Sequence, residues 1–203
     1  MNTIVVNNQS VTPSKIICIG RNYVEHITEL DNEIPDEMVV FLKPNSAIST
    51  DLSSYHQEPV HYEAELCFVY QNGTFSAVGF GLDLTKRQLQ SQLKAKGLPW
   101  ERAKAFDGSA IFSEFVLIDQ LDPTLSVQLK INNKVIQHGS IALMMVKPDD
   151  ILSELAGFIT LEDGDIVMTG TPKGVGLIEK GAIFQGEITI KNTPIVSGQW
   201  LAT

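Results

Sequence analysis

The sequence predicts a strand-rich α+β fold, and three observations lead to this prediction. Short runs of β-branched and aromatic residues, bounded by Gly, Pro, Asn and Asp, recur along all 203 residues. Helical periodicity is confined to a few short segments. These helices do not alternate with the strands as they would in a doubly wound parallel sheet. The length suits one domain with a sizeable core, and we interpret residues 1–203 as a single domain.

Strand composition marks most of the chain. The segments with this composition are Ile4–Val6, Lys15–Ile19, Met38–Leu42, Val60–Tyr70, Phe75–Leu82, Phe115–Ile118, Leu125–Ile131, Asp165–Thr169 and Phe184–Ile190. The sequence LKINNKVI also predicts a β-hairpin, because Asn132 and Asn133 can adopt the positive φ angles of a type I′ turn.

Three segments have helical patterns. Asn22–Leu30 is short and follows a Gly-Arg turn. Thr85–Lys96 begins with Thr85 and Gln88 in the spacing of a capping box. Pro148–Ile159 begins with proline in its first turn and repeats apolar residues at helical spacing.

The overall charge limits the classes of partner. A net charge of −9 and a pI near 4.8 disfavour nucleic acid and anionic membrane surfaces. A small anionic substrate stays possible, since a bound metal and a few Arg or Lys side chains can reverse the local sign of the potential.

The remaining composition predicts a protein of a reducing compartment. Cys18 and Cys67 each lie in an apolar run and are expected to be buried free thiols. The first residues lack the charged and long apolar regions of a signal peptide, and no apolar run approaches the roughly 20 residues of a membrane span. We therefore expect a cytoplasmic location.

Three carboxylates form the first candidate site. Glu63 and Glu65 are two apart in a predicted strand, so their side chains share a face. Asp83 follows a second apolar run and could supply a third oxygen ligand. Neighbouring like charges favour a bound cation, and three carboxylates suit Mg²⁺, Mn²⁺ or Ca²⁺ better than Zn²⁺. The alternative is an exposed acidic strand face.

The second candidate is the sequence GRNYVEHITEL. His26 and Glu29 are three apart, so on a helix they lie on one face, where the carboxylate can orient the imidazole as a general base. Arg21, next to a glycine turn, could bind a substrate carboxylate. The alternative is a pair of surface residues.

Two further segments carry polar groups of interest. Lys104 in WERAKAFDGS is either a surface charge or a cation that stabilises an enolate or carboxylate near a metal. The glycine-rich segment Gly164–Gly176 follows a strand and could expose backbone N–H groups and the Thr171 hydroxyl to a ligand oxygen. This segment lacks the pattern of a nucleotide phosphate loop.

These motifs together resemble the fumarylacetoacetate hydrolase (FAH) family. The motifs GRNYVEHITE, HYEAEL, GFGLDLTKRQLQ, W-x-x-AKAFD and GDIVMTGTPKGVG occur in the order typical of its short members, from about Lys15 to the C-terminus. One departure is Gln88, where many relatives carry Asp. The resemblance implies a strand-rich mixed β roll with few short helices, usually assembled as a homodimer.

The resemblance also implies roles for individual residues. Glu63, Glu65 and Asp83 would hold Mg²⁺, or Mn²⁺ or Ca²⁺. His26 and Glu29 would be a catalytic dyad on a lid segment of about residues 21–36. Lys104 would face the metal-bound substrate, and the remaining pocket residues would be Arg21, Gln90 and Thr171.

The implied activity is hydrolysis of a carbon–carbon bond in an acylpyruvate-type 2,4-dioxo acid through a metal-bound pyruvate enolate. The same site could act as an oxaloacetate decarboxylase, as a keto–enol tautomerase, or as an isomerase similar to 2-hydroxyhepta-2,4-diene-1,7-dioate isomerase. Outside enzymes, the alternative is a non-catalytic module that binds metal and carboxylate. The His26–Glu29 pair argues against that module, because metal binding alone does not need it.

Overall fold

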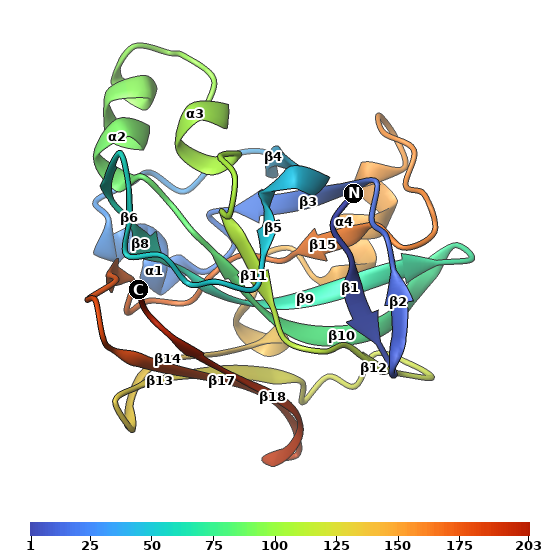
Figure 1. Cartoon of the computed structure of the whole chain (residues 1–203). Helices are drawn as coiled ribbons and strands as arrows, with labels where there is room; N and C mark the ends of the chain where they lie inside the picture. Colours follow the sequence, from blue (N-terminus) through green and yellow to red (C-terminus); the bar gives the residue numbers. More distant parts are fainter.

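The computed structural model describes residues 1–203 and is built around two β-sheets (Figure 1). The larger sheet has eight strands. Across it the order is β4 (Val39–Pro44), β3 (Lys15–Gly20), β15 (Ile166–Met168), β9 (Ala64–Gln71), β10 (Thr74–Asp83), β11 (Ala110–Phe112) and β5 (Ile48–Ser49), and β12 (Val116–Leu117) also pairs with β10.

The smaller sheet has four antiparallel strands. Their order is β14 (Lys134–Ser140), β13 (Ser126–Ile131), β17 (Ile183–Ile190) and β18 (Thr193–Leu201). Three two-stranded pairs complete the strands: β1 (Ile4–Val6) with β2 (Gln9–Val11), β6 (Tyr55–His56) with β7 (Glu58–Pro59), and β8 (His61–Tyr62) with β16 (Gly176–Leu177).

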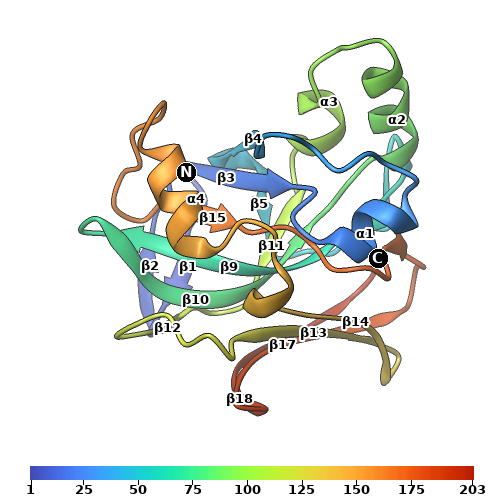
Figure 2. The same cartoon turned by 180° about the vertical axis from the view of Figure 1, so that it is seen from behind.

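The helices are few and short. They are α1 (Val24–Glu29), α2 (Arg87–Ala95), α3 (Glu101–Lys104) and α4 (Pro148–Leu155), with 3₁₀ turns at Asn45–Ala47 and Ile141–Leu143. Seen from behind, α4 lies beside β15, whereas α2 and α3 pack together at the other end of the sheet (Figure 2). None of these helices has the length and apolar character that crossing a bilayer requires.

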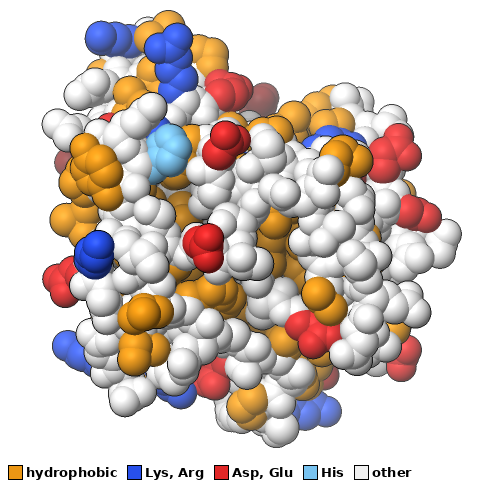
Figure 3. Space-filling model, in the orientation of Figure 1, with side chains coloured by type: hydrophobic (Ala, Val, Ile, Leu, Met, Phe, Trp, Pro, Cys, Tyr) orange, Lys and Arg blue, Asp and Glu red, His pale blue; other side chains and the backbone are white.

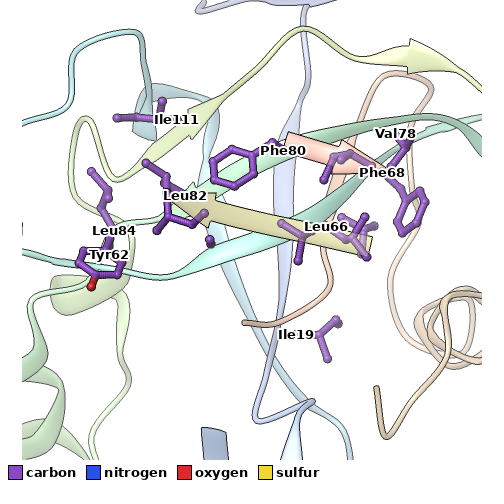
Figure 4. Close-up of a cluster of buried hydrophobic side chains, with 14 of the residues drawn as sticks. Ile19, Tyr62, Leu66, Phe68, Val78, Phe80, Leu82, Leu84 and Ile111 are labelled. Atoms are coloured by element: carbon purple, nitrogen blue, oxygen red, sulfur yellow. The ribbon is translucent and has the colours of Figure 1, made fainter. Parts of the chain in front are cut away.

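The main core lies between the two sheets. Figure 4 shows side chains of β9 and β10, among them Leu66 and Phe80, in this cluster. The Phe80 ring stacks on Trp200 of β18 with 5.6 Å between ring centroids. A Cβ atom at position 186 would lie 2.4 Å from the Phe80 ring, so glycine there lets the two sheets approach each other. This packing fixes β9 and β10, which carry Glu65 and Asp83.

The predicted fold class is confirmed: the structure is a strand-rich α+β roll with few short helices. The predicted hairpin is also present, with Asn132 and Asn133 at φ angles of 50° and 65°. Both cysteines are buried and free, as predicted. On the face seen in Figure 3, acidic and basic side chains are interspersed.

Several local predictions were wrong. The predicted strand Val60–Tyr70 is interrupted at Glu63, where β8 ends and β9 has not begun. Thr85 does not cap α2: the cap position is Lys86, and the Thr85 hydroxyl donates a hydrogen bond to the Asp83 carbonyl instead. Strand β18 was not predicted, because it contains Pro194, which only an edge strand tolerates.

Candidate active site

The three carboxylates come together at the ends of the two central strands. Asp83 is the last residue of β10, and its backbone N–H donates to the Glu63 carbonyl at 2.8 Å, just before β9 begins. Glu65 lies in β9 opposite Gly81. All three side chains are buried, and one oxygen of each lies within 4.8 Å of the others. The antiparallel register therefore makes one cluster from residues 20 positions apart.

Three cations surround this cluster. Lys104 Nζ donates to Glu63 at 2.7 Å and to Asp83 at 2.6 Å. Arg87 pairs with Glu63, and Lys43 Nζ lies 2.8 Å from Asp83 Oδ1. Lys104, predicted to face the substrate, thus lies directly against two of the predicted metal ligands.

Glu65 is the carboxylate without a cationic partner. Its oxygen accepts one hydrogen bond, from the Gly170 N–H at 2.8 Å. Burial, together with the charges of Asp83 and Glu63, raises the pKa of Glu65 well above its ordinary value. Burial acts in the same direction on Glu63, but Lys104 and Arg87 overcome it and hold the pKa of Glu63 well below its ordinary value.

The donor set fits a hard divalent cation. Asp83 Oδ1 is buried and accepts no hydrogen bond, although Lys43 is near. Glu65 would gain the positive charge that it lacks. Oxygen ligands without His or Cys suit Mg²⁺ or Mn²⁺. The cluster can therefore hold a divalent metal ion.

His26 faces the same cavity from helix α1 and is 6% exposed. Its Nδ1 lies 3.3 Å from Glu29 Oε2. A proton on Nδ1, shared with Glu29, leaves Nε2 free to accept another. Burial lowers the pKa of His26, which keeps the imidazole neutral near pH 7. The residue is thus suited to act as a base.

Glu29 is itself held by the loop after β15. Its Oε1 accepts a hydrogen bond from the Gly174 N–H at 2.9 Å. Gly174 has a φ angle of +101°, and a Cβ atom there would lie 2.3 Å from the Ile136 carbonyl oxygen. Only glycine can therefore present this N–H to the carboxylate that orients His26.

The structure places eight of the nine sequence-predicted site residues around one cavity. They are Arg21, His26, Glu63, Glu65, Asp83, Gln90, Lys104 and Thr171. The ninth, Glu29, does not line the cavity and bonds to His26. The cavity has a volume of about 40 Å³, whereas one buried water needs about 10–15 Å³. A small organic acid can therefore enter only if the surrounding segments move.

Two of these side chains are already engaged by the protein. The Thr171 hydroxyl donates to the Ala64 carbonyl at 2.9 Å and accepts from Gln137 Nε2 at 2.8 Å. This hydroxyl holds the loop to β9, while Thr171 also lines the cavity, so contact with a ligand stays a prediction. The Gln90 side-chain oxygen, Oε1, accepts a hydrogen bond from Arg87 Nη1 at 2.8 Å.

Several residues at the site were not predicted from the sequence. Among them, Asn32, Arg87, Lys94 and Trp100 line the cavity, and Lys43 lies next to Asp83 without lining it. Lys43 had a recognisable signal, because a lysine inside the apolar run VVFLKP is unusual in a buried strand. No sequence signal marked Lys94, since a lysine on a short amphipathic helix is normally exposed.

A family model described as fumarylacetoacetate (FAA) hydrolase C-terminal matches residues 15–196. The chain belongs to the fumarylacetoacetate hydrolase family. Among its relatives, the oxaloacetate tautomerase YcgM of Escherichia coli is 36% identical over 187 residues, which cover 83% of this chain and 85% of that protein. The mitochondrial oxaloacetate tautomerase FAHD1 of Bos taurus is 36% identical over 190 residues, covering 85% of this chain and 86% of that protein.

Solved structures of FAH-family proteins share the fold. A protein from Oleispira antarctica, whose crystal structure is described as that of a fumarylacetoacetate isomerase/hydrolase, superposes with a TM-score of 0.94 at 31% identity, covering 100% of both chains. The fumarylpyruvate hydrolase of Pseudomonas aeruginosa, solved with Mn²⁺ and pyruvate, gives a TM-score of 0.86 at 27% identity, covering 100% of this chain and 96% of that one.

Proposed function

We propose that this FAH-family protein is a divalent-metal-dependent tautomerase that interconverts the keto and enol forms of oxaloacetate. The observation that carries the proposal is His26, a buried neutral imidazole facing the same cavity as three carboxylates and Lys104. The relatives named oxaloacetate tautomerase support this choice of substrate over acylpyruvates.

Tautomerisation needs only a proton-moving group beside a polarised carbonyl. One C3–H bond of keto oxaloacetate breaks and one O–H bond forms on the C2 oxygen, without water and without a change of oxidation state. His26 Nε2 accepts the C3 proton, while Glu29, on Nδ1, stabilises the imidazolium that forms. The imidazolium then returns a proton to the C2 oxygen.

Glu63, Glu65 and Asp83 would hold the metal ion, Mg²⁺ or Mn²⁺. When bound, the ion would polarise the keto group as a Lewis acid. Lys104 places a second positive charge beside the same carboxylates, and its own pKa reflects this position: burial lowers it, but Asp83 and Glu63 raise it above the ordinary value. The ammonium therefore stays charged while negative charge develops on the substrate.

The cavity volume supports a moving lid. Residues of about 21–36 include Arg21, His26 and Asn32, which close one side of the 40 Å³ cavity. Opening this segment would admit the four-carbon acid, and closing it would remove water from around His26.

Hydrolysis of a fumarylpyruvate-type acid is the second candidate, favoured by the likeness to the fumarylpyruvate hydrolase. The same His26 would then activate a water, and the cavity would have to hold that water as well as a longer substrate. Decarboxylation of oxaloacetate would require neither a bound water nor space for a longer substrate. The non-catalytic module gains no support from a His26–Glu29 pair anchored to Gly174.

The test is to follow oxaloacetate by the ultraviolet absorbance of its enol form, with CO₂ release and fumarylpyruvate cleavage measured in parallel. With Mg²⁺ or Mn²⁺ present, interconversion should be the fastest of the three. His26→Asn should lower kcat by about 10²–10⁴-fold with Mn²⁺ affinity unchanged, and the exposed His138→Asn should have no effect. Faster cleavage of fumarylpyruvate would overturn the proposal in favour of the hydrolase.

A further inference from the structure

Two cations that line the cavity, Arg21 and Lys94, lack an anionic partner. Arg87 and Lys104 each pair with a carboxylate of the cluster. Arg21 and Lys94 also line the cavity but form no ion pair with any residue. Two cations that face the same cavity without an anionic partner attract an anion.

The side-chain oxygen of Asn32, which carries no net charge, lies between Arg21 and Lys94. Asn32 Oδ1 accepts from Lys94 Nζ at 2.5 Å and from Arg21 Nη2 at 3.5 Å. An amide oxygen carries only a partial charge, so two cations that converge on it are incompletely neutralised. A carboxylate in its place would form two charge-assisted hydrogen bonds.

Arg21 has an unusual backbone conformation, and hydrogen bonds of the next residue keep it there. Arg21 has a φ angle of 56°, a left-handed conformation that non-glycine residues rarely adopt. The next residue, Asn22, fixes this turn: its side chain donates to the Val146 and Thr169 carbonyls, each at 2.9 Å. Strain that neighbouring bonds enforce is typical of functional positions.

The second cation, Lys94, lies on helix α2, outside the segment that carries Arg21. It projects from α2 and is half-buried. Burial lowers the pKa of Lys94, and the positive charges of Arg21 and Arg87 lower it further. These repulsions are what a bound anion would relieve.

We propose that Arg21 and Lys94, now bridged by the Asn32 side chain, form the subsite for the second carboxylate of a dicarboxylic 2-oxo acid, which would displace the Asn32 oxygen. This inference rests on the proposed function, which places the 2-oxo acid end of the substrate at the carboxylate cluster. Arg21 and Asn32 belong to the lid segment and Lys94 to α2, so the bound carboxylate joins the two. The lid thus closes on substrates that carry the second charge.

The test compares two ligands that differ by this carboxylate. Oxaloacetate and pyruvate are titrated calorimetrically into the protein with Mg²⁺ present. Lys94→Met should weaken oxaloacetate binding about 10- to 100-fold, the usual range for a charge-assisted hydrogen bond, and leave pyruvate affinity unchanged. Lys96→Met, on the exposed side of the same helix end, should change neither. Equal weakening of both ligands, or of neither, would overturn the subsite.

Asn32→Asp gives a second test, in which the side chain keeps its size and gains a negative charge. The new carboxylate would pair with Arg21 and Lys94 and compete with the ligand, so the preference for oxaloacetate over pyruvate should disappear. An unchanged preference would contradict the subsite. If the parent protein bound oxaloacetate selectively without interconverting its tautomers, the subsite would stand and the proposed tautomerase would not.

Discussion

Lys43 carries a positive charge in the interior, with none of its surface exposed. Its ammonium donates to the carbonyls of Ser109, Leu84 and Lys104 and lies 2.8 Å from Asp83 Oδ1. The side chain therefore joins the loops on either side of α2 and α3 beneath the carboxylate cluster. It supports the site from below and does not line its cavity.

Replacing Lys43 should show how much the fold depends on this charge. Lys43→Met removes the cation and leaves buried carbonyls and Asp83 without their partner, so we expect a loss of about 3–5 kcal/mol in the free energy of unfolding. Urea denaturation followed by circular dichroism measures it. The exposed Lys180→Met should stay within about 0.5 kcal/mol of the parent. A similar small change for Lys43→Met would mean that the charge is dispensable.

At this scale the sequence predicted that Glu63, Glu65 and Asp83 lie together, which the structure shows, but for an incomplete reason. Alternation along one strand does not place Glu63, because the strand breaks there; the bond from Asp83 to the Glu63 carbonyl does. Lys43 and Lys94 escaped prediction because their roles come from distant partners. Local patterns do not contain such contacts.

Among the elements, helix α1 is attached to the protein mainly through its side chains. Glu29 accepts hydrogen bonds from Gly174, and Glu25 forms an exposed ion pair with Lys173 at 3.0 Å. A six-residue helix has little stability of its own. The loop after β15 therefore decides whether His26 stays in the cavity.

Gly174→Ala should loosen this helix. A Cβ atom at this position clashes with the Ile136 carbonyl, so the loop must shift and the Glu29 bond weaken. We expect faster amide hydrogen exchange in residues 24–30, measured by mass spectrometry. Gly181→Ala is the matched control, because Gly181 also has a positive φ angle, of +84°, but its Cβ would meet nothing within 4 Å. Equal exchange in α1 of both variants would rule out a specific role for Gly174.

Element boundaries were predicted where the chain's own chemistry decides them. The Asn132-Asn133 turn and the proline start of α4 are examples. The start of α2 was not predicted correctly. The Thr85 hydroxyl accepts a hydrogen bond from Lys104 at 2.6 Å, and this tertiary contact overrides the capping pattern. A contact within the candidate site thus prevented Thr85 from capping the helix.

For the molecule as a whole, metal binding should stabilise the parent protein and leave the stability of a Glu65 variant unchanged. The parent should gain about 2.7 kcal/mol when Mn²⁺ is at 100 times its Kd. Glu65→Gln removes a buried carboxylate whose ionised form is disfavoured by burial and by Asp83 and Glu63, so the melting temperature should rise without metal and should not respond to Mn²⁺. The exposed Asp119→Asn should respond like the parent. Equal Mn²⁺ stabilisation of Glu65→Gln would exclude Glu65 as a ligand.

Acid stability should depend on Asp165, which ties the start of β15 to β3. It accepts bonds from the Ser14 hydroxyl at 2.7 Å and Lys15 Nζ at 2.5 Å. Burial would raise the pKa of Asp165, but these donors outweigh it and lower the pKa below the ordinary value. The stabilisation is therefore fully present above the unfolded-state pKa, about 3.9, and is lost as the pH falls through the lower folded-state pKa.

Asp165→Asn tests that account. It should cost about 3 kcal/mol at pH 7, because a neutral amide cannot accept the same set of bonds. The difference from the parent should shrink as the pH falls below about 4, as measured by urea unfolding between pH 7 and pH 3. A difference that stays constant over this range would show that the charge of Asp165 contributes nothing.

The parallel pairing of β3 with β15 affects when the sheet can form during protein synthesis. Ile16 pairs with Ile166, 150 positions later in the chain. At a synthesis rate of about 5–20 residues per second, one edge of β3 waits roughly 8–30 s for its partner to be made. Gly170, whose N–H binds Glu65, follows β15 and emerges later still. A nascent chain on the ribosome therefore carries Glu63, Glu65 and Asp83 long before it has the scaffold that holds these three carboxylates together.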